Sequence, residues 1–357
     1  MARALRLAEK GLYTTTPNPR VGCVIVRDGQ VVGEGWHQRA GEPHAEILAL
    51  RQAGGAARGA TVYVSLEPCS HHGRTPPCAN ALIDAGVGRV VAAMRDPNPQ
   101  VCGRGIELLV LAGIRAEVGL LEAEAKELNL GFIRRMTRER PWVRLKTAAS
   151  LDGKTALESG ESKWITGEAA RADVHRWRAR ACAILTGVGT VLADDPQMNV
   201  RGVATPRQPL KVVLDSRLMT PPTARILAGG ALIVAAVEDA YRRAALEAAG
   251  AEVLLLPGED GRVDLARMLQ VLARRGINEL HVEAGATLNG ALLAGGWVDE
   301  WLGYYAPVAL GHRARGLFEV PALTDMAARH RFVLHDLCRL GADLRLTLRP
   351  LAQATDA

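Results

Sequence analysis

The sequence predicts an α/β protein of two domains, and three observations lead to that class. The chain has 357 residues, about twice the length of a typical single domain. Short β-branched runs alternate with amphipathic stretches in both halves, as in layered α/β domains. The alternation starts again at Trp142, after a basic run that ends at Pro141. We therefore place the domains at residues 1–140 and 141–357, with a linker helix at about 121–140.

The first domain is expected to combine a β-hairpin with alternating strands and helices. The Asp28-Gly29 turn separates two β-rich runs, which is typical of a hairpin. Pro43 opens a helix that ends before Gly54. The expected strands are 21–26, 31–36, 61–66, 87–94 and 116–120, and the expected helices are 2–11, 43–53, 77–85, 106–112 and 122–138.

The second domain is expected to hold a largely parallel sheet, because helices separate most of its strands. The glycine-rich segments 187–190 and 285–290 follow strands and could face phosphate, although by pattern alone each could be an ordinary turn. Neither has the Rossmann glycine pattern. The expected strands are 143–148, 182–186, 210–214, 232–236, 252–256, 279–283, 331–338 and 343–349, and the expected helices are 168–180, 239–249, 263–275 and 288–294.

The composition is that of a globular protein with a sizeable core. Hydrophobic residues make up 48% of the chain and charged residues 23%. No apolar run is long enough to span a bilayer, and the first residues lack the pattern of a secretory signal. Six cysteines in this length do not suggest a disulfide framework. We therefore expect a reducing, cytoplasmic setting.

The charge balance is basic, with a net charge of +6. Nucleic acid, small phosphorylated ligands or an arginine-rich composition without functional meaning could each explain it. Aromatic residues are only 4% of the chain, so surfaces for base stacking are scarce. We therefore expect small anionic ligands, with no nucleic-acid or membrane partner.

One constellation carries hydrolytic chemistry. His44, Cys69 and Cys78 would supply three zinc ligands, and water would take the fourth position. Glu46, two residues after His44, would stay off the metal and move protons, as in zinc-dependent nucleobase deaminases. The alternative is a surface histidine with two buried free cysteines. The four residues together favour the zinc site.

These motifs resemble the deaminase half of the bifunctional riboflavin-biosynthesis deaminase/reductases. The resemblance rests on segments 16–22, 35–37, 44–46 and 67–78. Eight residues separate Cys69 from Cys78, whereas about two do so in the general deaminase pattern. The resemblance implies a cytidine-deaminase-like, three-layer α/β/α fold and one Zn²⁺ per chain.

The same resemblance implies a substrate site in the first domain. In that family the loop between the cysteines helps to hold a 5′-phosphate, which implicates His71, Arg74 and Thr75. Asn18 and His37 match positions that contact the pyrimidine or ribose. Arg74 could instead be a solvated loop residue, and Asn18 could serve only the turn between two prolines.

The second half resembles the reductase half of this family, which has a dihydrofolate-reductase-like α/β fold and uses NADPH. The resemblance rests on segments 146–153, 160–162, 164–166, 183–196, 199–201, 215–216 and 283–290, and it thins after about residue 311. It implies NADPH contacts by Ala148, Trp164, Thr190, Asp194, Ser216, Gly285, Ala286, Thr287, Leu288, Asn289, Gly290 and Ala291. It implies substrate contacts by Ser162, Arg178, Arg201 and Glu283.

Some of these residues have an expected chemical role. Arg178 and Arg201 are expected to clamp phosphate, and Lys146 and Asp194 are candidate proton carriers. Trp164 could form a flat wall for a ring, or it could be a core residue.

We therefore expect a bifunctional enzyme of riboflavin synthesis. Its first domain would deaminate 2,5-diamino-6-ribosylamino-4(3H)-pyrimidinone 5′-phosphate. Its second would reduce the ribosyl side chain with NADPH to give 5-amino-6-(5-phospho-ribitylamino)uracil. The alternatives are a nucleic-acid (tRNA) adenosine or cytidine deaminase with an unrelated C-terminal domain, a zinc-stabilised binding module, and an enzyme that has lost one activity. We also expect a homo-oligomer of unspecified size.

Overall fold

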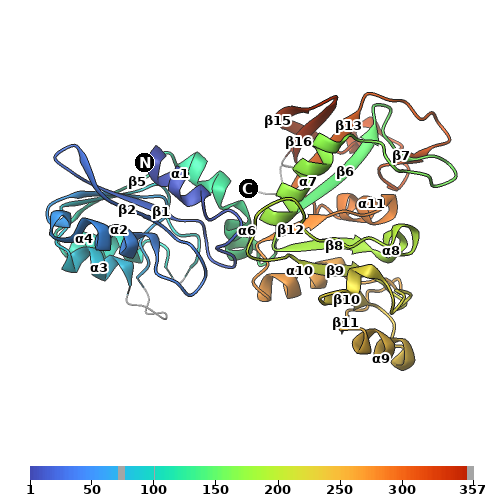
Figure 1. Cartoon of the computed structure of the whole chain (residues 1–357), viewed down its shortest axis with the longest axis horizontal. Coiled ribbons are helices and arrows are strands. Elements are labelled where there is room, and N and C mark those ends of the chain that lie inside the picture. The colour runs from blue at the N-terminus through green and yellow to red at the C-terminus, as the bar shows by residue number, and fades with distance from the viewer. Residues whose placement is uncertain (71–76, 100, 352–357) are drawn as a thin grey trace. The chain divides into compact units, whose positions relative to one another are not determined.

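The computed structural model of the chain describes residues 1–70, 77–99 and 101–351. It divides into two compact units, Met1–Arg140 and Pro141–Ala357 (Figure 1). Each unit contains a sheet covered by helices, so the expected α/β class with two units is confirmed.

The first unit is built on a mixed five-stranded sheet of order β2-β1-β3-β4-β5. The hairpin is confirmed, because β1 and β2 pair antiparallel across a turn in which Asp28 and Gly29 both have positive φ. Strands β3, β4 and β5 run parallel to one another. The strands are β1 (Gly22–Arg27), β2 (Gln30–Trp36), β3 (Thr61–Val64), β4 (Arg89–Ala92) and β5 (Arg115–Val118).

Helices cover both faces of this sheet. Helix α1 buries Val24 on one face, whereas α2 packs its alanines on Cys23 and Ile25 of the other. The helices are α1 (Ala2–Glu9), α2 (Ala45–Ala53), α3 (Cys78–Asp84), α4 (Arg104–Leu111), α5 (Glu122–Leu128) and α6 (Leu130–Arg138), with a 3₁₀ turn at Gly54–Ala57. The single helix expected over 122–138 is wrong, because the chain breaks at Asn129, whose side chain turns inward to Arg20.

The second unit is built on a nine-stranded sheet of order β11-β10-β9-β8-β12-β6-β13-β16-β15. The first seven strands in that order are parallel, and β16 and β15 are antiparallel, so the largely parallel sheet is confirmed. The strands are β6 (Trp142–Ser150), β8 (Ala183–Gly187), β9 (Leu210–Leu214), β10 (Ala231–Ala235), β11 (Ala251–Leu255), β12 (Glu279–Val282), β13 (Glu300–Ala306), β15 (Phe332–Leu340) and β16 (Asp343–Pro350).

Two groups of helices bury the two faces of this sheet. Helices α10 and α11 pack with Val143 and Leu145 on one face, whereas α7, α8 and α9 pack on the other. The helices are α7 (Glu168–Arg180), α8 (Val188–Asp194), α9 (Ala240–Ala248), α10 (Leu265–Arg274) and α11 (Ala286–Ala294). Strands β7 (Lys154–Ala156) and β14 (Arg315–Gly316) form a small separate ribbon, and 3₁₀ turns lie at Arg225–Leu227 and Met326–Ala328.

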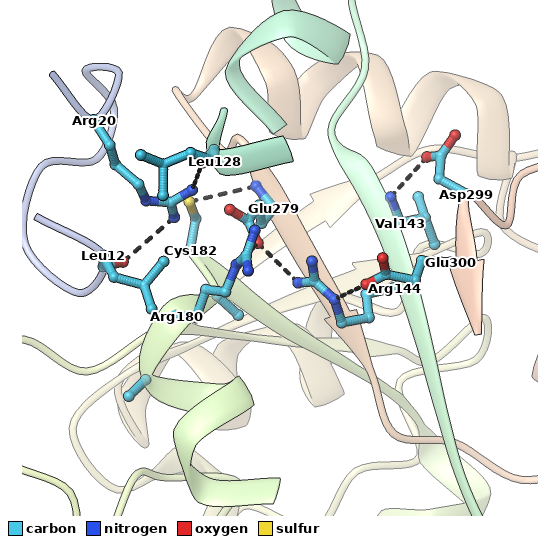
Figure 2. Close-up of polar contacts among 12 residues, drawn as sticks. Leu12, Arg20, Leu128, Val143, Arg144, Arg180, Cys182, Glu279, Asp299 and Glu300 are labelled. Carbon is cyan, nitrogen blue, oxygen red and sulfur yellow. Dashed lines mark hydrogen bonds and ion pairs between the residues drawn. The ribbon is translucent and has the colours of Figure 1, made fainter. Parts of the chain in front are cut away.

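A buried ionic network joins the central strands of the second unit. Arg144 of β6 is fully buried and donates to Glu279 of β12 at 2.8 Å and to Glu300 of β13 at 2.5 Å (Figure 2). Arg180 forms an ion pair with Glu279 and Arg349 forms one with Glu300, which completes the network. Because each carboxylate meets two guanidinium groups, the desolvated charges are paired.

Within the described residues, no helix combines the length and the apolar character that crossing a membrane requires.

Candidate active sites

Three predicted metal ligands meet in the first unit. The Nδ1 atom of His44 lies 3.6 Å from Cys69 Sγ and 3.3 Å from Cys78 Sγ. The three donor atoms lie within 4.8 Å of one another. Cys78 also hydrogen-bonds to Cys69, and this contact is the largest cause that lowers the pKa of the Cys69 thiol below its usual range. One nitrogen and two sulfur donors form the set that zinc prefers, so the residues fit this metal.

The local fold explains how these donors are brought together. His44 is the N-cap of α2 and Cys78 is the first residue of α3, whereas Cys69 follows β3. Helix α2 can lie close to β2 because the strand carries glycines at the contact. A Cβ atom at Gly35 would stand 2.6 Å from the carbonyl oxygen of Ala45. The glycines of β2 therefore allow the close approach that sets the position of α2, the helix that begins beside His44.

Glu46 points into the same site and is almost completely buried, with 3% exposure. Burial, with a further contribution from Cys69, raises the pKa of Glu46 to about 7. Its Oε2 atom has no hydrogen-bond partner among the described residues. A buried carboxylate with a free oxygen and a pKa near neutrality is suited to accept and return a proton.

Two predicted substrate residues lie beside the metal cluster. Asn18 Nδ2 and His37 Nε2 are 3.0 Å apart, and the His37 ring meets the His44 ring edge-on at 5.3 Å. His37 Nδ1 lies 3.3 Å from the Pro43 carbonyl oxygen. The other three predicted substrate residues of this unit, His71, Arg74 and Thr75, lie outside the described residues.

The second unit contains a cavity of about 1510 Å³. That volume exceeds the ordinary range for a single drug-sized ligand, so it has room for a dinucleotide and a substrate. The predicted residues that line it are Lys146, Ala148, Ser162, Trp164, Arg178, Thr190, Asp194, Arg201, Ser216, Glu283, Gly285, Ala286, Thr287, Leu288, Asn289 and Ala291.

Gly290 is the predicted cofactor residue that is absent from this lining. A Cβ atom there would stand 1.9 Å from the backbone oxygen of Glu319, so the glycine faces a neighbouring segment. Both glycine-rich segments meet the cavity at helix starts, since Gly187 precedes α8 and Gly285 precedes α11. The predicted turn at 187–190 is therefore largely the first turn of a helix.

A paired carboxylate marks one wall of the cavity. Arg178 donates to both oxygens of Glu283, at 2.5 and 2.9 Å, and Lys146 Nζ lies 3.8 Å from the same carboxylate. Burial would raise the pKa of Glu283, but Arg178 and Lys146 hold it well below its usual range. Burial also lowers the pKa of Lys146, against the opposing effect of Glu283.

Trp164 and Asp194 are more exposed than a core position would allow. Trp164 is 71% exposed, so it is not a core residue, and the guanidinium of Arg171 lies 4.6 Å from its ring centre. Asp194 is paired with Lys163 at 3.7 Å. Both residues are therefore accessible from the cavity.

Several residues that line the cavity were not predicted from the sequence. Arg171 and His175 lie on the same face of α7 as Arg178, a relation that their spacing of four and three residues encodes. Arg217 and Arg225 line the cavity near Ser216. No local motif marks these two arginines.

Unpaired polar atoms show that the cavity wall fits a polar ligand such as a nicotinamide dinucleotide. Asp215 Oδ1 and Asn289 Oδ1 are buried and have no hydrogen-bond partner among the described residues. Both residues belong to the cavity wall. The starts of α8 and α11 add backbone N–H groups, which suit phosphate.

Fold and sites together define a class of protein. It is a two-domain α/β enzyme, with a deaminase-type set of metal-ligating side chains in one unit and a nucleotide-sized cavity in the other. Residues 1–94 match the cytidine and deoxycytidylate deaminase zinc-binding region, and residues 141–346 match the RibD C-terminal domain. The chain belongs to the RibD family of bifunctional deaminase/reductases of riboflavin biosynthesis.

The similarity extends over whole chains. The riboflavin biosynthesis protein RibD of Escherichia coli is 51% identical, with 98% of each chain covered. The structure of Acinetobacter baumannii RibD is 47% identical, covers 98% of each chain and has a TM-score of 0.92. A deaminase/reductase of Thermotoga maritima is 35% identical, covers 98% of this chain and 97% of its own, and has a TM-score of 0.88. A nucleic-acid deaminase with an unrelated C-terminal domain is therefore not favoured.

Proposed function

We propose that residues 1–140 deaminate 2,5-diamino-6-ribosylamino-4(3H)-pyrimidinone 5′-phosphate and that residues 141–357 then reduce its ribosyl side chain. The final product would be 5-amino-6-(5-phospho-ribitylamino)uracil. The observation that carries this proposal is the combination of two sites in one chain. Three metal-ligating side chains lie beside buried Glu46 in one unit, and the other unit holds a dinucleotide-sized cavity. The Thermotoga relative is described as a diaminohydroxyphosphoribosylaminopyrimidine deaminase and 5-amino-6-(5-phosphoribosylamino)uracil reductase, which supports the proposal.

In the deaminase, His44, Cys69 and Cys78 would hold one Zn²⁺ per chain. The metal would act as a Lewis acid that lowers the pKa of water. Glu46 would take a proton from the attacking water and return it to the departing amine, so that water and an amine become a carbonyl and ammonia. Asn18 and His37 would hold the pyrimidine or ribose, and His71, Arg74 and Thr75 would hold the 5′-phosphate.

In the reductase, the cofactor would be NADPH, which would supply the hydride. The segment Gly285–Ala291 would hold it together with Ala148, Trp164, Thr190, Asp194 and Ser216. C1′ of the opened ribose would receive the hydride, and a proton would go to the former ring oxygen. We favour Lys146 over Asp194 as the source of this proton, because Lys146 lines the cavity 3.8 Å from Glu283, is more enclosed than Asp194 and has a lowered pKa.

The substrate of the reductase would meet Ser162, Arg201, Arg178 and Glu283. Arg178 is already bonded to Glu283 and to the carbonyl oxygen of Asn199. We therefore propose that Arg178 orients Glu283, and that Arg201, whose guanidinium donates to Gln197 Oε1 at 2.8 Å, is the phosphate clamp.

We also propose a cytoplasmic setting and a homo-oligomer. All six cysteines are free thiols, which suits a reducing compartment. Light scattering on the purified protein would measure the oligomeric state.

The function is tested by metal analysis and a two-step assay on the purified protein. We expect one zinc per chain, ammonia release from the diaminopyrimidine substrate, and NADPH oxidation that requires the deaminated product. Ammonia release without NADPH oxidation would leave only the deaminase, and the absence of both would reject the proposal.

A further inference from the structure

Helices α5 and α6 lie, in the sequence, between the two segments that match known protein families. Those matches cover residues 1–94 and 141–346. By its contacts, however, the segment belongs to the compact unit Met1–Arg140. The break between its helices falls at Asn129, which ends α5 and precedes α6. Asn129 is therefore part of the deaminase unit.

Asn129 binds the backbone of the chain's first loop. Its side chain is 1% exposed, its Oδ1 accepts from the backbone N–H of Arg20 at 2.8 Å, and its Nδ2 donates to the Arg20 carbonyl oxygen at 3.0 Å. One amide thus satisfies both backbone groups of Arg20, as a neighbouring strand would. The Arg20 guanidinium returns the contact by donating to the carbonyl oxygens of Leu128 at 2.6 Å and Leu12 at 3.3 Å (Figure 2).

The backbone held in this way carries the substrate side of the deaminase site. Asn18, two residues before Arg20, contacts the His37 ring. The backbone N–H of His37 donates to the carbonyl oxygen of Val21 at 2.8 Å, so His37 is tied to the residue after Arg20. Arg135 of α6 adds a bond to the carbonyl oxygen of Pro17 at 3.0 Å. A shift of residues 17–21 would therefore move both proposed pyrimidine contacts.

We propose that Asn129 is a positioning residue for the deaminase, and that helices α5 and α6 are a working part of its substrate site. The inference rests on the proposed function, since it requires Asn18 and His37 to bind the pyrimidine substrate. Asn129 would act through Arg20 and would not touch the substrate itself. The metal ligands lie on other segments, so the effect falls on substrate binding and leaves the metal in place.

The test uses the full-length, zinc-loaded protein and the variants Asn129→Ala and Asn129→Asp. We expect Asn129→Ala to raise KM for deamination at least tenfold, with kcat changed less than threefold, zinc content unchanged and NADPH oxidation on the deaminated substrate unchanged. Asn129→Asp keeps the acceptor for Arg20 N–H but sets a carboxylate oxygen against the Arg20 carbonyl, so its KM should rise as well. It also provides a second variant if the alanine protein does not fold.

The matched control is Ala125→Gly, a buried change on α5 that removes no bond to residues 17–21. It should lower Tm and leave KM unchanged. Hydrogen exchange at the Arg20 amide gives a readout without substrate, and protection there should fall in the Asn129 variants only. An unchanged KM in both Asn129 variants, or an equal rise in Ala125→Gly, would overturn the inference. If the wild-type protein releases no ammonia, the proposed function is rejected. A loss of Arg20 protection in the Asn129 variants would in that case still support the contact between Asn129 and Arg20.

Discussion

At Glu46, the carboxylate combines near-complete burial with an oxygen that has no partner among the described residues. Glu46→Gln keeps the size of the side chain but removes its ability to take a proton. We expect ammonia release to fall by about 10²–10⁴-fold, the usual contribution of general acid–base catalysis. Zinc content should stay the same, because Glu46 is not one of the three clustered donors.

Ammonia assay and metal analysis on the same preparation check this prediction. Glu42→Gln is the matched control, since Glu42 is an exposed carboxylate just before the same helix, and it should retain activity. Full activity in Glu46→Gln would show that another group moves the proton.

At Lys146, the proposed proton source predicts a pH dependence with a definite sign. Burial lowers the pKa of Lys146 and the charge of Glu283 raises it. Only the protonated amine can donate, so reductase activity should decline as pH rises through a pKa below the ordinary lysine value. Glu283→Gln removes the influence that raises this pKa, so the decline should move to lower pH.

Profiles of kcat/KM against pH measure the shift, and Lys146→Met serves as the reference that should lack this decline. A decline that stays in place in Glu283→Gln, or that moves to higher pH, would assign it to a different group.

At the scale of elements, the contact between β2 and α2 controls where the metal site forms. Gly35→Ala would place a methyl group 2.6 Å from the Ala45 carbonyl oxygen, so the helix must move. We expect a loss of about 1–3 kcal/mol in the free energy of unfolding, together with weaker zinc binding. Gly55→Ala is the control, because nothing lies within 4 Å of its added carbon.

Urea unfolding and a competitive chelator titration separate the two effects of Gly35→Ala. Weakened zinc binding in the Gly55 variant alone would contradict the proposed link between strand and metal site.

Elements with clear periodicity were predictable and those stabilised by buried charge were not. Helix 168–180 and strand 210–214 have the expected bounds, because their patterns are unbroken. Strand β13 was missed, since it begins at Glu300 directly after Asp299, and two adjacent acidic residues resemble a loop in sequence. In the fold, Asp299 accepts from the backbone of Val143 and Glu300 pairs with Arg144 (Figure 2). Because these partners lie far away in the sequence, no local pattern near residue 300 predicts the strand.

The same limit applies to the sites. The metal donors could be found because their spacing is a local motif, and Glu46 has a fixed offset from His44. Arg217 and Arg225 could not, because only the folded cavity brings them near Ser216. Asn129 was hidden inside what looked like an uninterrupted helix.

The network around Arg144 predicts a large loss of stability in the second unit. Arg144→Met would leave two buried carboxylates short of a partner, at a cost of about 3–5 kcal/mol. Arg275→Met also removes an arginine that pairs with a carboxylate, but the pair with Glu252 is partly exposed and should cost at most about 1 kcal/mol. Denaturant unfolding compares the two, and equal losses would contradict the role assigned to burial.

At the scale of the whole molecule, the two units should respond to different ligands. Donors of the metal cluster all come from Met1–Arg140, whereas every residue that lines the large cavity comes from Pro141–Ala357. A ligand that binds only the folded state stabilises it by about 2.7 kcal/mol at a concentration one hundred times its Kd. Zinc should therefore stabilise one unit and NADPH the other.

Chelation makes this difference measurable by calorimetry. Removing zinc should lower the unfolding transition of Met1–Arg140 by several degrees or more, since about 1 kcal/mol corresponds to a shift of about 2–8 °C in domains of these sizes. The transition of the other unit is identified as the one that Arg144→Met lowers and NADPH raises. Because none of the clustered metal donors lies in that unit, chelation should leave its transition in place. A chelator that moves the transition sensitive to Arg144→Met, or that moves neither, would contradict the assignment of zinc to the first unit.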